Sequence, residues 1–186
     1  MEAAAIGLFT ALILSLVWHL GRALAAWQTL VPSLLFGYLS SGVVHWFCDN
    51  FFEEDSPLIG PLFIHSFREH HRDPEGMTHH GFLELTGNSC LAMIPALAAA
   101  LWWRDSLGAF SKATVVFLCL ALFATNQLHK WAQARTAPAV VLTLQRWRII
   151  LPPAHHRRHH ENGYSGAYCI TNGWMSLSLD YLLGRR

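Results

Sequence analysis

The sequence predicts an all-α, multi-pass membrane protein with about four transmembrane helices and a histidine-rich cytoplasmic cap. Three observations predict this class. The chain of 186 residues is 53% hydrophobic and only 13% charged, which is more apolar than an average soluble domain. Its apolar residues gather in four long runs, and its twelve histidines lie mostly between and after these runs. We therefore expect a single membrane domain over residues 1–186.

The four apolar runs are the predicted spans. Residues 3–20 contain no Asp, Glu, Lys or Arg, and at 1.5 Å per residue they make about 27 Å of helix, close to the hydrocarbon thickness of a bilayer. The second run, about 28–48, is interrupted mostly by small or hydroxylated residues that let membrane helices pack closely. The third, about 88–104, tolerates Pro95 as a kink. The fourth, about 111–129, ends in polar residues at the expected membrane surface.

Four crossings place the two histidine-rich segments, 49–87 and 129–174, on the same side of the membrane. With His45 at the end of the second span, eleven of the twelve histidines share that face. Ten of the 13 Lys and Arg residues lie there too, so the positive-inside rule makes this face cytoplasmic. We expect an integral protein of the inner membrane in a bacterium, or of the endoplasmic reticulum in a eukaryote.

Charge and cysteine content exclude other classes of protein. The formal net charge is only +1, which gives no reason to expect a nucleic-acid partner. The four cysteines stand far apart without a Cys-x-x-Cys pair, so neither a disulfide framework nor a zinc knuckle is indicated.

The histidines are spaced as metal ligands. In the run 155–160, residues three and four apart share one face of a helix, so their imidazoles can point to common sites. At the membrane end of the second span, an i, i+4 pair supplies one nitrogen and one oxygen ligand. The candidate ligands on this reasoning are His45, Asp49, His65, His70, His71, His129, His155, His156, His159 and His160.

This ligand set indicates two redox-active metal ions. Imidazole-dominated sites suit iron, zinc or copper, and eight or more nitrogen ligands exceed what one ion can use. A dinuclear iron site held by histidines at a membrane surface activates O2 to attack the C–H bonds of lipid chains, whereas zinc has no redox chemistry. The alternative for 155–160 is a basic patch that binds lipid headgroups. A headgroup-binding patch would require neither histidine in place of lysine nor further histidine pairs elsewhere in the chain.

Four motifs stand in order between His45 and Trp174. They are His45-Trp46-Phe47-Cys48-Asp49-Asn50-Phe51, Phe67-Arg68-Glu69-His70-His71-Arg72-Asp73-Pro74, Asn126-Gln127-Leu128-His129-Lys130-Trp131, and His155-His156-Arg157-Arg158-His159-His160 followed by Tyr168-Cys169-Ile170-Thr171-Asn172-Gly173-Trp174. In this order they resemble the Kua/CarF family of membrane lipid desaturases. That family includes plasmanylethanolamine desaturases of animals and bacteria and phosphatidylglycerol desaturases of plastids.

The resemblance implies a diiron enzyme that introduces a double bond into an alkyl or acyl chain of a phospholipid. It implies O2 as oxidant and two external electrons from a cytochrome b5-like or ferredoxin-like donor. In the plasmanyl branch the new bond is the vinyl ether of a plasmalogen, which is the leading expectation. The resemblance implies that Asp49 binds iron or orients a histidine, and it sets His65 aside. The metal ligands it implies are His45, His70, His71, His80, His129, His155, His156, His159 and His160.

Two positions depart from the family pattern and keep alternatives open. Gln133 stands where the family usually has histidine, and Tyr164 stands where the plasmanyl branch has histidine and the plastid branch tends to have tyrosine. A phosphatidylglycerol acyl-chain desaturase or a lipid hydroxylase on the same centre therefore remains an alternative. Two further classes are a non-catalytic metal-binding protein and a zinc-dependent membrane hydrolase, in which a carboxylate would act as base. The candidates for that base are Glu69, Glu84 and Glu161.

Overall fold

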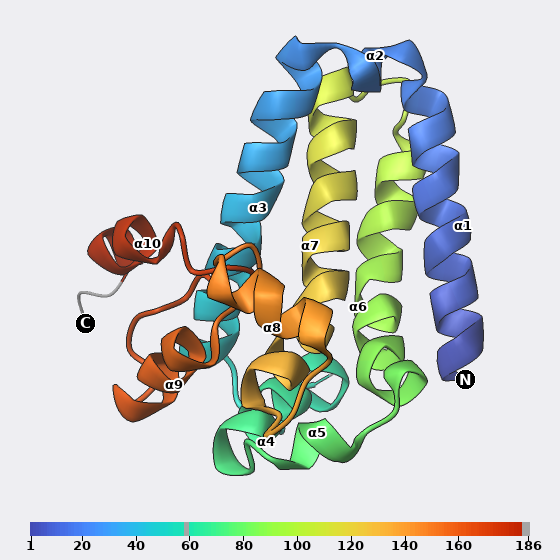
Figure 1. The fold of residues 1–186 in the computed structure, drawn as a ribbon. Coiled ribbons are helices and arrows are strands. Elements are labelled where there is room, and N and C mark those ends of the chain that lie inside the picture. Colours follow the sequence, from blue (N-terminus) through green and yellow to red (C-terminus); the bar gives the residue numbers. More distant parts are fainter. Residues whose placement is uncertain (58–59, 184–186) are drawn as a thin grey trace. The chain divides into compact units, whose positions relative to one another are not determined.

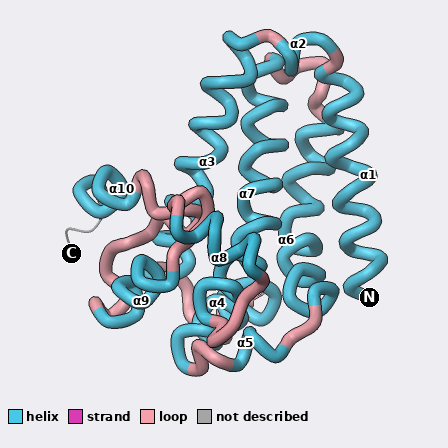
Figure 2. The backbone as a smooth tube through the Cα atoms, viewed as in Figure 1, coloured by secondary structure: helices cyan, strands magenta, loops and turns pink. Residues whose placement is uncertain are grey.

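The computed structural model describes residues 1–57 and 60–183, with the backbone alone at 62–63 and 66–67. These residues form helices and connecting loops and include no strand (Figures 1 and 2). The prediction of an all-α protein is therefore confirmed.

In the described part of the chain, four helices are long and apolar enough to cross a membrane, as predicted. They are α1 (Glu2–Leu20), α3 (Trp27–Asn50), α6 (Phe82–Trp102) and α7 (Ala109–Gln133). The third helix begins at Phe82, well before the expected 88, and the fourth continues past 129 to Gln133. An apolar run marks only the part of a helix that suits hydrocarbon, whereas backbone hydrogen bonding continues into polar residues at each end.

The described chain falls into two compact units. Unit 1 comprises residues 1–40 and 82–123, and unit 2 comprises residues 41–81 and the chain from 124 onward. Helices α3 and α7 each contribute their first part to unit 1 and their last part to unit 2.

Unit 1 is built on the packing of α1 along α6 (Figure 1). It also contains the short α2 (Arg22–Ala25). Every third or fourth residue of α1 is buried, so one face of this helix meets the core. In that core the ring of Phe9 stacks on Phe123 with centroids 5.4 Å apart. The buried residues of α1 are Ala5, Phe9, Ile13, Leu16 and Leu20.

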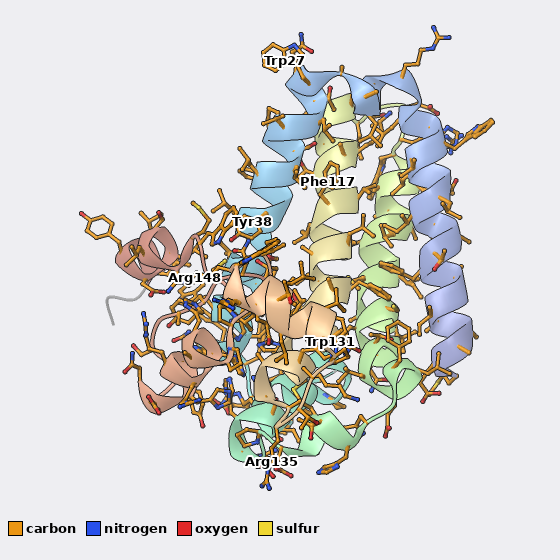
Figure 3. All side chains as sticks on the ribbon, in the orientation of Figure 1. Trp27, Tyr38, Phe117, Trp131, Arg135 and Arg148 are labelled. Atoms are coloured by element: carbon orange, nitrogen blue, oxygen red, sulfur yellow. The ribbon has the colours of Figure 1, made fainter. Side chains whose placement is uncertain are left out.

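The surface of unit 1 carries large apolar side chains. Trp18 is 82% exposed and Trp102 is 80% exposed, and Figure 3 shows Trp27 projecting from the first turn of α3. Tryptophans near the ends of long apolar helices are typical of membrane interfaces, where one edge of the ring stays in contact with water. The exposed apolar surface of unit 1 is therefore suited to lipid.

Unit 2 carries the histidine-rich segments. Besides the ends of α3 and α7 it contains η1 (Gly60–Ile64), α4 (His65–Arg72), α5 (Gly76–His79), α8 (Ala139–Arg146), α9 (Pro153–Glu161) and α10 (Ser176–Leu183). Loops join these short helices (Figure 2). The predicted helix over 155–160 is confirmed as α9, which begins at a proline whose fixed φ suits a first helical turn.

Candidate metal centre

Seven histidines and one aspartate converge in unit 2. They come from four helices, and neighbouring imidazole centroids lie 4.2 to 6.3 Å apart. The end of α3 supplies His45 and Asp49, α4 supplies His70 and His71, α7 supplies His129, and α9 supplies His156, His159 and His160. Sequence analysis predicted all eight, and the structure brings them together.

The first group of ligand atoms surrounds the carboxylate of Asp49. Its Oδ2 lies 3.4 Å from His45 Nε2 and 3.5 Å from His159 Nε2. Its Oδ1 lies 3.5 Å from His71 Nε2, which is 3.3 Å from His159 Nε2. Two ligands of one ion lie roughly 3 to 3.5 Å apart when each bond is about 2.1 Å long. These four side chains therefore offer three nitrogens and an oxygen at the spacing of metal ligands.

A second group of ligand atoms shares His45 with the first. It contains His45, His70 and His129, which are all buried and offer nitrogens within 4.8 Å of one another. The His129 ring is 4.6 Å from that of His156, whose Nε2 is 3.0 Å from His160 Nε2. One ion takes about four to six ligands, so the combined set is sufficient for two ions.

Two backbone carbonyls fix the orientation of two of these imidazoles. His159 Nδ1 donates a hydrogen bond to Gly166 O at 2.7 Å, and His45 Nδ1 donates one to Tyr168 O at 3.3 Å. With the proton on Nδ1, the lone pair of each ring is on Nε2, which is the atom that faces Asp49. Such carbonyl partners are the usual supports of metal-binding histidines.

The loop that provides both carbonyls is held by α10. Asp180 accepts hydrogen bonds from Ala167 N at 2.9 Å and Tyr168 N at 3.5 Å. Ser176 Oγ accepts one from Cys169 N at 3.2 Å. Sequence analysis missed Asp180 and Ser176, because they belong to no motif and their partners are only recognisable once the loop is folded.

Two predicted ligands, His80 and His155, are not among the eight clustered residues. The Nε2 of His155 forms a hydrogen bond with Ser176 Oγ at 2.9 Å, so this ring supports the loop. At about 100° per residue on a helix, His155 points roughly 140° away from His160, which explains why α9 cannot direct both at one site. His80 is in neither group, and its carbonyl oxygen accepts a hydrogen bond from Lys130 Nζ.

His65, which the resemblance sets aside, lies at an exposed position. Its Nδ1 is 2.8 Å from Glu54 Oε2, and Arg72 Nη1 is 2.7 Å from Glu54 Oε1. This arrangement ties the start of α4 to the preceding loop and leaves His65 outside the cluster.

Burial favours the neutral form of the imidazoles of His71, His156, His159 and His160. Burial, together with the neighbouring imidazoles, lowers the pKa of His71 to about 2. Burial lowers the pKa of His159 to about 4 and that of His156 well below its ordinary value. Neutral rings keep the lone pairs that a metal ion requires.

Several polar atoms inside the cluster lack a hydrogen-bond partner among the residues that the structure describes. They include both carboxylate oxygens of Asp49, Nε2 of His129 and Nδ1 of His156. Leaving a buried polar atom unsatisfied costs about 1–3 kcal/mol, so such atoms are rare in native proteins. A metal ion satisfies carboxylate oxygens and imidazole nitrogens together, and the side chains present therefore fit a pair of bound ions.

Gln133 and Tyr164 contact histidines of the cluster. Tyr164 stacks on His71 with ring centroids 3.8 Å apart and an interplanar angle of 8°, and its hydroxyl donates a hydrogen bond to His71 O at 3.0 Å. The side-chain Nε2 of Gln133 lies 2.9 Å from His156 Nε2.

A cavity of about 560 Å³ adjoins the cluster. Gln133 contributes to its wall and also contacts His156, so this residue connects the cavity with the histidine cluster. Lys130, Glu75 and Arg135 supply charged groups around it, and Arg135 donates three hydrogen bonds of 2.8, 3.0 and 3.2 Å to the Glu75 carboxylate. Figure 3 shows Arg135 extending from the segment that follows α7.

Comparison with known proteins identifies a matching family and several relatives. Residues 34–183 match the family described as Lipid desaturase domain. Plasmanylethanolamine desaturase of Myxococcus xanthus is 40% identical over 186 aligned residues, which cover 96% of this chain and 66% of that protein. Plasmanylethanolamine desaturase 1 of Mus musculus is 36% identical, with 86% of this chain and 64% of that protein covered.

A more distant relative belongs to a plant. Fatty acid desaturase 4, chloroplastic, of Arabidopsis thaliana is 30% identical over 76% of this chain and 44% of its own length. The chain spans just under two thirds of the length of the bacterial and mouse relatives. No solved structure matches the chain.

Proposed function

The chain belongs to the lipid desaturase family, and we propose that it introduces a carbon–carbon double bond into an alkyl or acyl chain of a membrane phospholipid. The observation that carries this proposal is the convergence of seven histidines and Asp49 in one buried cluster. The leading substrate is a plasmanylethanolamine, because the bacterial and mouse relatives are named for that lipid. The match at 34–183 includes residues of both units, which supports one desaturase domain.

The cofactor in this proposal is a pair of iron ions. One is assigned to His45, Asp49, His71 and His159, and the other to His70, His129, His156 and His160. When bound, the iron pair would supply the activation of O2. Two electrons from the substrate and two from an external donor reduce the O2 to two waters, which contain the two hydrogens removed from the substrate and two further protons. A cytochrome b5-like or ferredoxin-like protein is the proposed donor.

The protein side chains orient the proposed metal ligands and shield the site from water. Asp49 places one negative charge between three imidazoles, and the carbonyls of Gly166 and Tyr168 keep two of those rings in the orientation that presents Nε2. Nearly complete burial of His45 and His159 excludes bulk water, which strengthens the electrostatic interactions inside the site and limits side reactions.

The charged cavity supports a phospholipid whose reacting bond is near its headgroup. A vinyl ether forms at the carbon next to the ether oxygen, so the reacting carbons lie only a few bonds from the glycerol. The headgroup must then lie close to the metal centre, as this cavity does. Lys130 and Arg135 suit a phosphate, and Glu75 suits an ammonium group.

Acyl-chain desaturation is the second candidate function. Tyr164, the residue expected in the plastid branch, stacks directly on His71, so the plastid-type substrate has a structural argument of its own. A lipid hydroxylase on the same centre would use the same side chains.

Localisation is part of the proposal. The four candidate spans support an integral membrane protein. We place the histidine cluster at the cytoplasmic face of the bacterial inner membrane or of the endoplasmic reticulum, because most basic residues share its side.

Lipid analysis tests the function. The protein is expressed in a host that contains plasmanylethanolamine but makes no plasmalogen, and lipids are measured by mass spectrometry before and after mild acid, which cleaves vinyl ethers. We expect an acid-labile product two mass units below the substrate. His159→Ala should abolish it, and Arg157→Ala, which changes an exposed residue of the same helix, should not. New acyl double bonds alone would favour the second candidate, and unchanged lipids would contradict both.

A further inference from the structure

Gln133, the last residue of α7, places its side-chain amide among the histidines of α9. Its Nε2 lies 2.9 Å from His156 Nε2 and 3.5 Å from His160 Nε2. These two imidazole nitrogens are 3.0 Å from each other. The three atoms therefore form a triangle with the spacing of ligands that share one ion, which is roughly 3 to 3.5 Å for bonds of about 2.1 Å.

Hydrogen bonding alone gives an incomplete account of this triangle. The Oε1 of Gln133 is buried and has no hydrogen-bond partner among the described residues, and neither has Nδ1 of His156. The nitrogen and oxygen of a glutamine amide occupy nearly equal volumes, so a half-turn of the amide exchanges them at almost no steric cost. After that turn, an amide oxygen and two imidazole nitrogens face a common point, which is the arrangement that a cation requires.

We propose that Gln133 binds, through Oε1, the same metal ion as His156 and His160. This inference rests on the proposed diiron function and adds a ligand that neither the histidine pattern nor the family resemblance assigns. An amide oxygen is a harder donor than imidazole, and imidazole suits iron better. The ion at Gln133 is therefore held less tightly than the ion beside the Asp49 carboxylate.

The closing experiment measures metal binding by the purified full chain, not turnover. Wild type and variants are loaded with ferrous iron-57 without oxygen in detergent, and iron per chain, the rate of iron loss to a chelator and the Mössbauer spectrum are recorded. The variants are Gln133→Ala and Gln133→Glu. Gln127→Ala, a glutamine of the same helix outside the cluster, is the matched control.

The expected wild-type result is two irons that leave in two phases. Gln133→Ala should accelerate the faster phase roughly tenfold or more, within the range for support residues of metal sites, and change one Mössbauer doublet. Gln133→Glu keeps an oxygen ligand and adds negative charge, so it should slow that phase. Gln127→Ala should match wild type.

Three results would overturn the inference, and they are distinguishable. If wild type binds two irons and Gln133→Ala leaves both phases and both doublets unchanged, Gln133 is not a ligand although the diiron proposal stands. If Gln133→Glu loses iron as Gln133→Ala does, the amide acts through its N–H groups as a hydrogen-bond donor. If wild type binds no iron, the proposed function fails, and this inference fails with it.

Discussion

Asp49 is the carboxylate of the first proposed metal group. Its two oxygens face His45, His71 and His159 at 3.4 to 3.5 Å, and they accept no hydrogen bond from the described part of the chain. A buried carboxylate surrounded by neutral imidazoles is costly unless a cation neutralises it. In the proposed function, a bound cation would therefore neutralise this carboxylate, which a water molecule would not do.

Replacing Asp49 with asparagine tests this reasoning. Asp49→Asn keeps the shape of the side chain but removes its charge, so we expect about one iron per purified chain in place of two, as a two-ion site predicts, together with loss of lipid desaturation. Elemental analysis and lipid mass spectrometry measure both. Asp55→Asn, at an exposed loop position, is the control. Two irons and full activity in Asp49→Asn would show that the carboxylate is dispensable.

His155 and His156 are neighbours with different expected roles. His155 bonds to Ser176 Oγ, whereas His156 is buried among the imidazoles of the cluster. His155→Ala should therefore retain about two irons, as expected for a two-metal site, with a lower unfolding temperature, and His156→Ala should lose iron. Metal analysis and thermal unfolding in detergent distinguish them. Equal loss of iron in both variants would restore His155 to the ligand set that the sequence predicts.

At the scale of elements, helices were predictable and the supporting loop was not. The i, i+4 relation of His45 and Asp49 and the spacing within 155–160 identify ligands because helical geometry fixes which residues share a face. The same spacing cannot show which face of the helix points toward the other histidines, so it also predicts His155 as a metal ligand. Asp180 reaches Ala167 across 13 positions, and no local periodicity encodes such a contact.

The loop is expected to act through the metal ligands that it orients. Asp180→Asn keeps one acceptor oxygen but weakens the hold on Ala167 and Tyr168, so the carbonyls that fix His45 and His159 become less ordered. We expect iron affinity to fall by roughly tenfold, as for other residues that support metal ligands, while both ions still bind at saturating iron. Chelator competition measures this. Asp105→Asn, on an exposed turn, is the control, and unchanged affinity in Asp180→Asn would refute the role.

For the whole chain, the number and order of spans could be predicted, because a continuous apolar run of this length has few structural interpretations other than a transmembrane helix. The structure confirms four helices long enough to span. The ends of α6 and α7 were less predictable, since polar residues such as Glu84 and Lys130 extend a helix without adding to its apolar run.

Sidedness is a prediction for the whole chain that labelling can check. All four native cysteines are buried, so a cysteine introduced at an exposed position gives a clear signal with a membrane-impermeant maleimide. Glu161→Cys should react only from the cytoplasmic side, and Asp105→Cys only from the opposite side. Reaction of both variants from one side would show that the span count or the positive-inside assignment is wrong.

The measurement that tests the central claim most directly is the iron and zinc content of the purified chain. The protein is taken from cells grown with adequate iron, beside His156→Ala and His159→Ala. We expect about two irons per chain, in accordance with two-metal chemistry, and loss of iron in both variants. Zinc alone in the wild type, persisting after reconstitution with ferrous iron, would contradict the diiron desaturase and favour a zinc-dependent hydrolase.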